Sequence, residues 1–419
     1  MRQRVQGVAL REWVLSTGLK SLFSYRPSRA AYTAGYLMVV LTIGAYLPTP
    51  LYPVYQAQLG FSDLALTLVY SVFPLVSAVA LLLFGPASDM VGRRAVLRIA
   101  VLLGALGSLS FLAADGLAWL FLGRALQGVA LGAATGAATA LIVDQAPIRH
   151  RRWTSALATV AFLAGTALGP VLGGALAQYL PAPGVVPYVL HLLTLVLGWQ
   201  LASRLSSATP AAGRLAGWRL SLPRIPAAIK TPFHFSAVVG FLAWTVVGIF
   251  LSTVPSVLER SAGITNVATI GSILAALLAF AMAMQPLIPL LDARRAQIMG
   301  LIGLLLSLVV LGMQLGASLL LTLLSAAIAG CGVGLAYGGS AAEVDAITAP
   351  EQRGGVNAAL YLAYYLGSGV PAVVLGLLSL RVGMTDALAV LVAIIAVATG
   401  GAWYISRFVP RAHQVDTML

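Results

Sequence analysis

The stretch FGPASDMVGRRAVL, residues Phe84 to Leu97, places one acid, two arginines and two glycines between two long apolar runs. A run of about 20 apolar residues is long enough to cross a bilayer as a helix. The runs on either side of Phe84 to Leu97 meet that length. The stretch therefore predicts a short charged loop that joins two membrane spans on one side of the bilayer.

The composition extends this interpretation to the whole chain. Of the 419 residues, 60% are hydrophobic and only 9% are Asp, Glu, Lys or Arg. The apolar runs are too long for barrel strands, and backbone amides in hydrocarbon must be satisfied within a helix. We expect twelve spans, the first at 31–54, the second at 63–84 and the last at 384–406. Residues 1–30 do not resemble a cleavable signal, because the apolar run that follows is too long for a signal-peptide core.

The formal net charge of +13 is explained by where the cations lie. If both termini are cytoplasmic, every lysine and arginine falls on the cytoplasmic side except Arg124, Arg260 and Arg381. This is the distribution that orients membrane proteins. We therefore expect a multi-pass protein of the cell membrane with cytoplasmic termini, and no nucleic-acid partner.

The chain divides into two similar halves around a polar, proline-containing interruption. Several residues recur 201 or 202 positions later: Arg93 as Arg294, Asp144 as Asp345, Arg152 as Arg353, Pro170 as Pro371, and the glycines at 128, 132 and 136 as those at 330, 334 and 338. Such repeats are typical of transporters that rock two bundles about a central site. The predicted organisation is a cytoplasmic tail (1–30), a six-helix bundle (31–203), a cytoplasmic linker (204–232), a second six-helix bundle (233–408) and a cytoplasmic tail (409–419).

The segment Gly85 to Arg94 resembles the signature of the major facilitator superfamily between helices 2 and 3, with departures at Ala87 and Met90. The resemblance implies an all-α membrane fold of twelve helices in two pseudo-repeat bundles. It also implies a cytoplasmic latch made by Gly85, Asp89, Gly92, Arg93 and Asp144. Asp89 would approach the N-terminus of helix 11, where free amides favour an anion, and Arg93 would meet Asp144. The alternative is a solvated basic loop that only sets topology.

Two further segments resemble signatures of proton-coupled and drug-exporting members. Arg124-Ala125-Leu126-Gln127-Gly128 resembles the R-x-x-Q-G signature, and Gly165 to Gly174 resembles the antiporter signature G-x3-G-P-x2-G-G. The resemblance implies coupling or cavity roles for Arg124 and Gln127. It implies a gate formed by Gly165, Gly169, Pro170, Gly173 and Gly174.

Each of these roles has a simpler alternative. Glycines at every fourth position let helix backbones approach closely, so the stripe can serve packing alone, whereas a proline within a span permits bending. An arginine inside a span is costly and indicates a polar cavity, although Arg124 could instead snorkel to the outer interface.

Aromatic residues dominate the candidate wall of a central pocket, although aromatics in membrane helices also serve packing. The candidates are Tyr46, Phe73, Trp244, Tyr337, Asn357 and Tyr361. Together they indicate an adaptable hydrophobic pocket suited to lipophilic compounds, cationic or neutral. None of the twelve acids lies in the middle of a predicted span, the nearest being Asp63 and Glu343. We therefore expect Arg124 to act on proton coupling indirectly, through its field on a nearby acid or water.

Other classes of function lack their motifs. The sequence contains no G-x4-G-K-[ST] loop, no Cys/His metal cluster and a single cysteine, Cys331. We expect no metal, no cofactor and no enzymatic activity. The expected function is proton-coupled export of hydrophobic drugs or related small molecules by a monomer. A carrier for a polar metabolite such as a sugar or amino acid, or a non-transporting membrane sensor with the same fold, are the alternatives.

Overall fold

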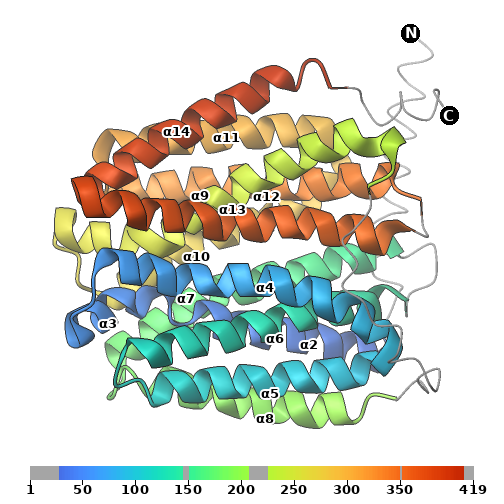
Figure 1. Cartoon of the computed structure of the whole chain (residues 1–419), viewed down its shortest axis with the longest axis horizontal. Helices are drawn as coiled ribbons and strands as arrows, with labels where there is room; N and C mark the ends of the chain where they lie inside the picture. The colour runs from blue at the N-terminus through green and yellow to red at the C-terminus, as the bar shows by residue number, and fades with distance from the viewer. Residues whose placement is uncertain (1–27, 145–150, 207–224, 350–351, 410–419) are drawn as a thin grey trace.

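The computed structural model describes residues 28–144, 151–206, 225–349 and 352–409. In those ranges the regular elements are all helices, and twelve helical segments are long and apolar enough to cross a bilayer. The prediction of a twelve-span all-α protein is confirmed. Figure 1 shows the helices lying roughly side by side, with their ends gathered at two opposite faces.

The first bundle contains six of the spans. Its helices are α2 (Arg29–Tyr46), continued by the 3-10 turn η1 (Thr49–Leu51) and α3 (Tyr52–Leu59), then α4 (Asp63–Val91), α5 (Arg93–Leu112), α6 (Leu117–Asp144), α7 (Arg151–Tyr179) and α8 (Val186–Ser203). Pro48 and Pro50 interrupt the first span, because proline removes a backbone donor and clashes with the preceding turn. The first span therefore runs to Leu59 as a broken helix instead of ending at 54.

The second bundle contains the other six. It consists of the 3-10 turn η4 (Ala227–Ile229), α9 (Lys230–Ala262), α10 (Val267–Ala283), the 3-10 turn η5 (Gln285–Leu290), α11 (Ala293–Gln314), α12 (Leu319–Ile347), α13 (Arg353–Val382) and α14 (Met384–Ile405). Prolines at 286 and 289 convert the end of the eighth span to a 3-10 turn. The predicted tails and linker fall largely outside the described residues, so their bounds stay predictions.

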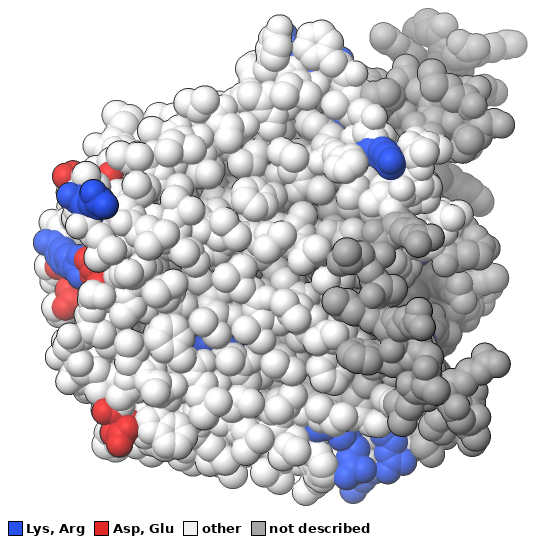
Figure 2. All heavy atoms as spheres, viewed as in Figure 1, with Lys and Arg blue, Asp and Glu red and all other residues white. Residues whose placement is uncertain are grey.

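We call the face where α2 begins and α14 ends the terminal side, and the opposite face the far side. In Figure 1 the terminal side is at the right. Figure 2 shows that, on the face in view, charged atoms gather near the two ends of the helices and the band between them is almost uncharged. This is the charge distribution that a bilayer requires.

Small residues hold neighbouring helices of each bundle at short distance. A Cβ on Gly132 of α6 would lie 2.5 Å from the carbonyl oxygen of Ser77 in α4. At the repeat-related position, a Cβ on Gly334 of α12 would lie 2.5 Å from the carbonyl oxygen of Ala281 in α10. The two glycine stripes thus have the same packing role in the two bundles, as the sequence repeat implies.

The bundles meet mainly through two pairs of helices, α4 with α13 and α7 with α10. The hydroxyl groups of Tyr70 and Ser368 lie 2.7 Å apart across the first pair. At the second pair, a Cβ on Gly271 would lie 2.3 Å from the carbonyl oxygen of Pro170. Since Tyr70, Pro170 and Gly271 all lie in the halves of their helices nearer the far side, the bundles are in close contact there.

Candidate functional site

The signature loop is shorter than predicted. Helix α4 continues to Val91 instead of ending near 84, and Gly92 alone separates it from α5, which begins at Arg93. Gly92 has φ 90° and ψ 142°, a conformation that favours glycine, so the predicted need for a glycine at this turn is confirmed. Gly85 is half-buried in the last turns of α4, and no heavy atom lies within 4 Å of a Cβ built on it.

The ionic contacts of the latch stay predictions. The side chains of Asp89 and Asp144 lie outside the described part of the structure, in the last turns of α4 and α6. At the start of α13, Gly354 and Gly355 are exposed, and no heavy atom lies within 4 Å of a Cβ built on either.

The second bundle contains a repeat-related copy of the latch residues, and the structure describes it. Its ion pairs differ from the Arg93–Asp144 pair expected in the first bundle. Arg294, the counterpart of Arg93, pairs with Glu343 at 3.3 Å, and both side chains are buried. The guanidinium carbon of Arg294 also lies 4.4 Å from the ring centroid of Phe235. Asp345, the counterpart of Asp144, instead pairs with Arg353 at 3.4 Å on the exposed surface.

The residues of the predicted gate divide between two faces of α7. A Cβ on Gly165, Gly169 or Gly173 would lie within 3 Å of α2 or of Leu47 just beyond it, so these glycines pack inside the first bundle. Gly174 faces the other bundle: a Cβ there would lie 2.6 Å from the carbonyl oxygen of Val267 in α10. Pro170 contacts the same helix through Gly271. Only Pro170 and Gly174 are therefore at the junction of the bundles.

Arg124 lies inside the protein, and its side chain is 1% exposed. This burial contradicts the snorkelling alternative. Its Nη1 donates hydrogen bonds to the carbonyl oxygen of Ala45 and, at 2.9 Å, to Oε1 of Gln127. Gln127 in turn donates from Nε2 to the carbonyl oxygen of Gly44 at 2.8 Å. Helical spacing of three residues places Arg124 and Gln127 on one face, as predicted.

The surroundings of Arg124 differ from the expectation of a nearby acid. Its guanidinium carbon lies 4.4 Å from the ring centroid of Phe73, which meets Tyr46 edge to face at 5.6 Å. Among the described residues, no carboxylate forms an ion pair with Arg124. Aromatic rings and backbone carbonyls surround the charge instead.

The candidate pocket residues form two aromatic clusters. Tyr46 and Phe73 belong to the first bundle with Arg124, whereas Trp244, Tyr337 and Tyr361 lie in the second. Tyr364, which was not among the candidates from the sequence, also belongs to this second cluster. Its ring centroid is 5.1 Å from that of Tyr337 and 5.6 Å from that of Tyr361. Spacing of three from Tyr361 could have identified it, since that spacing also shares a helix face. Asn357 is half-buried, one turn before Tyr361.

The second cluster reaches the first bundle through Trp244. Its ring centroid lies 5.9 Å from that of Tyr337 and 6.0 Å from that of Phe162 in α7. The indole N–H of Trp244 and the hydroxyl of Tyr364 are buried without a hydrogen-bond partner among the residues that the structure describes. The junction of the bundles thus combines large apolar surfaces with a few unused polar atoms, which is typical of small-molecule sites.

An ion pair on the far side joins the two bundles. Arg260, near the end of α9, contacts Asp63 at the start of α4 through both terminal nitrogens, with Nη1 to Oδ2 at 2.7 Å. Gln56 of α3 also donates to Asp63 at 2.8 Å. The sequence singled out Asp63 as an acid near a span but did not indicate its partner.

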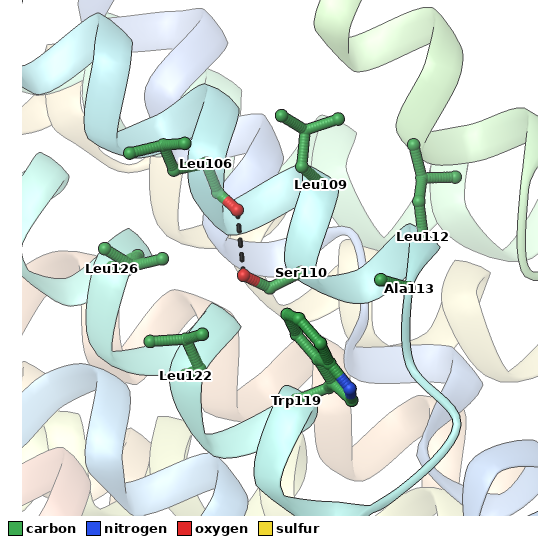
Figure 3. A pocket seen from close by; sticks show the side chains of 8 residues that line it. All are labelled: Leu106, Leu109, Ser110, Leu112, Ala113, Trp119, Leu122 and Leu126. Atoms are coloured by element: carbon green, nitrogen blue, oxygen red, sulfur yellow. Dashed lines mark hydrogen bonds between the residues drawn. The ribbon is translucent and has the colours of Figure 1, made fainter.

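A groove on the outer surface of the first bundle is unrelated to this junction. Figure 3 shows it between α5 and α6, with Leu106, Leu109, Trp119 and Leu122 on its wall. Its volume is about 620 Å³, and these four side chains are between 38% and 47% exposed. Ser110 donates its hydroxyl to the carbonyl of Leu106 in its own helix at 2.9 Å. The groove faces the surroundings of the protein.

Comparison with known proteins agrees with this architecture. The family model of the major facilitator superfamily matches residues 35–370. The chain is 34% identical over 144 residues to the multidrug resistance protein MdtG of Proteus mirabilis, a match covering 32% of this chain and 35% of that protein. It is 40% identical over 108 residues to the MFS-type transporter TwmF of Talaromyces wortmannii, covering 26% of this chain and 20% of that one. The matched segments thus span about a third or less of these relatives.

Solved structures resemble the chain over most of its length. A D-xylose–proton symporter matches with a TM-score of 0.76 at 15% identity, covering 92% of this chain and 98% of that one. A bacterial homologue of the human lysosomal transporter Spinster matches with a TM-score of 0.68 at 14% identity, with the same coverages. At these identities the likeness is one of fold. With the family model matching most of its length, the chain belongs to the major facilitator superfamily of membrane transporters.

Proposed function

We propose that this protein exports lipophilic small molecules across the cell membrane in exchange for protons, by alternating access between its two bundles. The observation that carries the proposal is the position of the antiporter-like signature: Pro170 and Gly174 contact α10 of the opposite bundle. A proline at this junction lets α7 bend, because the helix lacks one backbone hydrogen bond there. The relationship to the multidrug resistance protein MdtG supports export as the direction.

The two aromatic clusters support a lipophilic substrate. Trp244, Tyr337, Tyr361 and Tyr364 offer large apolar faces, with the unpartnered Trp244 N–H and Tyr364 hydroxyl as polar contacts. Aromatic surfaces with few polar groups bind through area rather than through many directed hydrogen bonds. A sugar, by contrast, requires many paired donors and acceptors.

The terminal side is the cytoplasmic side in this proposal, because most of the arginines in the described residues lie there. Gly85, Asp89, Gly92, Arg93 and Asp144 would form the latch that closes this side when the site faces outward. Asp63 and Arg260 form an ion pair between the bundles on the far side, and in this proposal the pair holds that side closed. Alternating access then consists of exchanging one closure for the other. Arg124 and Gln127, both buried, are the candidates for linking that exchange to protons.

The proposal is tested by dye accumulation in cells with and without the protein, each with and without an uncoupler. We expect lower accumulation of a lipophilic dye when the protein is present, and loss of this difference when the uncoupler abolishes the proton gradient. Asp89→Asn and Arg93→Ala should reduce export while leaving the amount of protein in the membrane largely unchanged. Arg381→Gln, which removes an exposed arginine on the far side, serves as the matched control.

Three results would contradict the proposal. Equal dye accumulation with and without the protein would point to a sensor or to a different cargo. Uptake of a sugar or amino acid would support the polar-metabolite carrier. Substrate movement without proton movement in reconstituted vesicles would rule out antiport.

A further inference from the structure

Arg124 carries a buried positive charge that no described acid neutralises. It is 1% exposed, and the described ion pairs use other residues. Two acids of the first bundle have undescribed side chains, Asp89 and Asp144. They lie far along their helices: the rise per residue puts Asp144 about 30 Å from Arg124 along α6. On the same rise, Asp89 is about 24 Å along α4 from Phe73, the residue that Arg124 contacts. Neither can pair with Arg124.

Hydrogen-bond donors near this charge are also unused. The Nε of Arg124, the hydroxyl of Tyr52 and the hydroxyl of Thr49 are buried and have no hydrogen-bond partner in the described part of the chain. Arg124 bonds to the carbonyl oxygen of Ala45, which lies seven residues before Tyr52 in the broken first span. A buried donor without an acceptor costs about 1–3 kcal/mol, and an unpaired buried charge costs more. The arrangement lacks an acceptor with negative charge.

The elements that carry Thr49 and Tyr52 contact both bundles, and Arg124 bonds to α2, which precedes them. Thr49 belongs to η1, which packs against α7 of its own bundle and against α9 and α10 of the other. Tyr52 begins α3 directly after it and is 1% exposed. When the bundles separate, this surface becomes part of the wall of the cleft. The rings of Phe73 and Tyr46 beside Arg124 supply apolar surface next to the donors.

We infer that Arg124, Tyr52 and Thr49 bind the anionic group of an aromatic, lipophilic substrate, such as a carboxylate, sulfonate or phenolate, and that the cleft selects anions over cations of the same shape. The inference rests on the proposed export function and makes its substrate class specific. An anionic oxygen would give the Nε of Arg124 or the Tyr52 hydroxyl the acceptor that each lacks among the described residues, and hydrogen bonds to charged groups are stronger than neutral ones. A cationic compound in the same place would be repelled by Arg124 at low dielectric.

The test uses two dyes that share one xanthene skeleton, the methyl esters of fluorescein and of rhodamine, at mildly alkaline pH. The first is then an anion and the second a cation. Fluorescence anisotropy with the full-length protein in lipid nanodiscs gives the affinity for each. Wild-type protein should bind the fluorescein ester with an affinity at least about tenfold higher than that for the rhodamine ester. The anionic fluorescein ester gains a charged hydrogen bond, whereas the cationic rhodamine ester is repelled by Arg124.

Variants separate a binding role from a structural one. Arg124→Gln should remove the preference for the anion, and Arg124→Lys should retain part of it, because lysine keeps the charge but not the planar fork. Tyr52→Phe removes a buried hydroxyl without a partner among the described residues, so thermal stability should be unchanged or higher while affinity for the fluorescein ester falls severalfold. Arg381→Gln removes an exposed far-side charge and should change neither affinity.

The outcomes also separate this inference from the proposed function. If wild-type protein binds the rhodamine ester as tightly as the fluorescein ester, or binds neither, the anion site is wrong. Uncoupler-sensitive export of rhodamine ester from cells would in that case still support the exporter. An unchanged anion preference in both Arg124→Gln and Tyr52→Phe would likewise overturn the assignment.

Discussion

At the scale of single residues, one ion pair among the described residues connects the two bundles. It is the far-side pair of Asp63 and Arg260. Its side chains are 22% and 42% exposed, so water weakens the attraction. Exposed pairs contribute about 0–1 kcal/mol. That is enough to shift an equilibrium between two bundle positions of similar energy, although it would matter little for folding.

We expect Asp63→Asn to favour opening of the far side. A cysteine introduced at Ser256, which is buried in the far-side half of α9, should then react about two- to fivefold faster with an impermeant maleimide, in line with a pair of this strength. The reporter should be placed in a background lacking Cys331. Asp386→Asn, which changes an exposed far-side acid outside the pair, should leave the rate unchanged.

Exchanging the two residues provides the converse measurement. The double variant Asp63→Arg with Arg260→Asp should restore the slow labelling of the parent. Equally fast labelling in the exchanged and single variants would show that the pair does not hold the far side closed.

The pair of Arg294 and Glu343 differs from this one in burial, and its removal should act on stability. Both side chains are 3% exposed or less. Glu343→Gln leaves Arg294 charged in a dry environment, so we expect a loss of about 3–5 kcal/mol in the free energy of unfolding. Asp345→Asn, in the exposed pair with Arg353, should cost less than about 1 kcal/mol. Denaturant unfolding of the purified variants compares the two, and equal losses would contradict the assigned burial.

At the scale of elements, α7 shows how one glycine motif serves two purposes. Gly165, Gly169 and Gly173 recur every four residues and form one face, which packs on the first span. Pro170 and Gly174 are also four apart but lie one residue further on, which rotates them toward α10. Sequence spacing defines both faces. Which one meets the other bundle follows only from where α10 lies.

This division predicts different consequences for two similar substitutions. A Cβ at Gly173 would lie 2.1 Å from the Leu47 carbonyl inside the first bundle, and one at Gly271 would lie 2.3 Å from the Pro170 carbonyl between the bundles. Gly173→Ala should therefore lower thermal stability, at a cost of about 1–3 kcal/mol for the forced displacement. Gly271→Ala should change stability less, because the bundles can separate to relieve the clash, and should increase labelling of the cysteine at Ser256.

Gly35→Ala is the matched control, since no heavy atom lies within 4 Å of a Cβ there. In this control, both the thermal stability and the labelling rate of the cysteine at Ser256 should equal those of the parent protein. If Gly173→Ala opened the far side as much as Gly271→Ala does, the assignment of the two faces to packing and gating would be wrong.

At the scale of the whole molecule, the orientation in the membrane follows from charge. The described ends of the chain lie on one side, where α2 begins and α14 ends (Figure 1). We expect a reporter fused after Leu419 and another inserted in the 204–232 segment to be cytoplasmic, because positive loops are retained there. A reporter active only outside the cytoplasm, fused at the same two positions, should give no signal. A signal from it at either position would contradict the proposed orientation.

The sequence by itself determined the class of fold and its internal repeat. Apolar runs of sufficient length must form spanning helices, since backbone amides have no other partner in hydrocarbon, and local patterns therefore decide them. The turn at Gly92 was likewise predictable, because a positive φ favours glycine wherever the rest of the chain lies.

Tertiary structure alone decided which residues meet. Asp63 and Arg260 are far apart in the sequence, and so are Tyr70 and Ser368, yet each pair joins the two bundles. The sequence likewise placed Arg124 inside a span but did not show which residues contact it. Helical periodicity fixes only which way a side chain faces on its own helix. Its contacts depend on the packing of helices that no local pattern specifies, and for this reason the unpaired charge of Arg124 and the unused donors of Tyr52 and Thr49 became visible only in the folded protein.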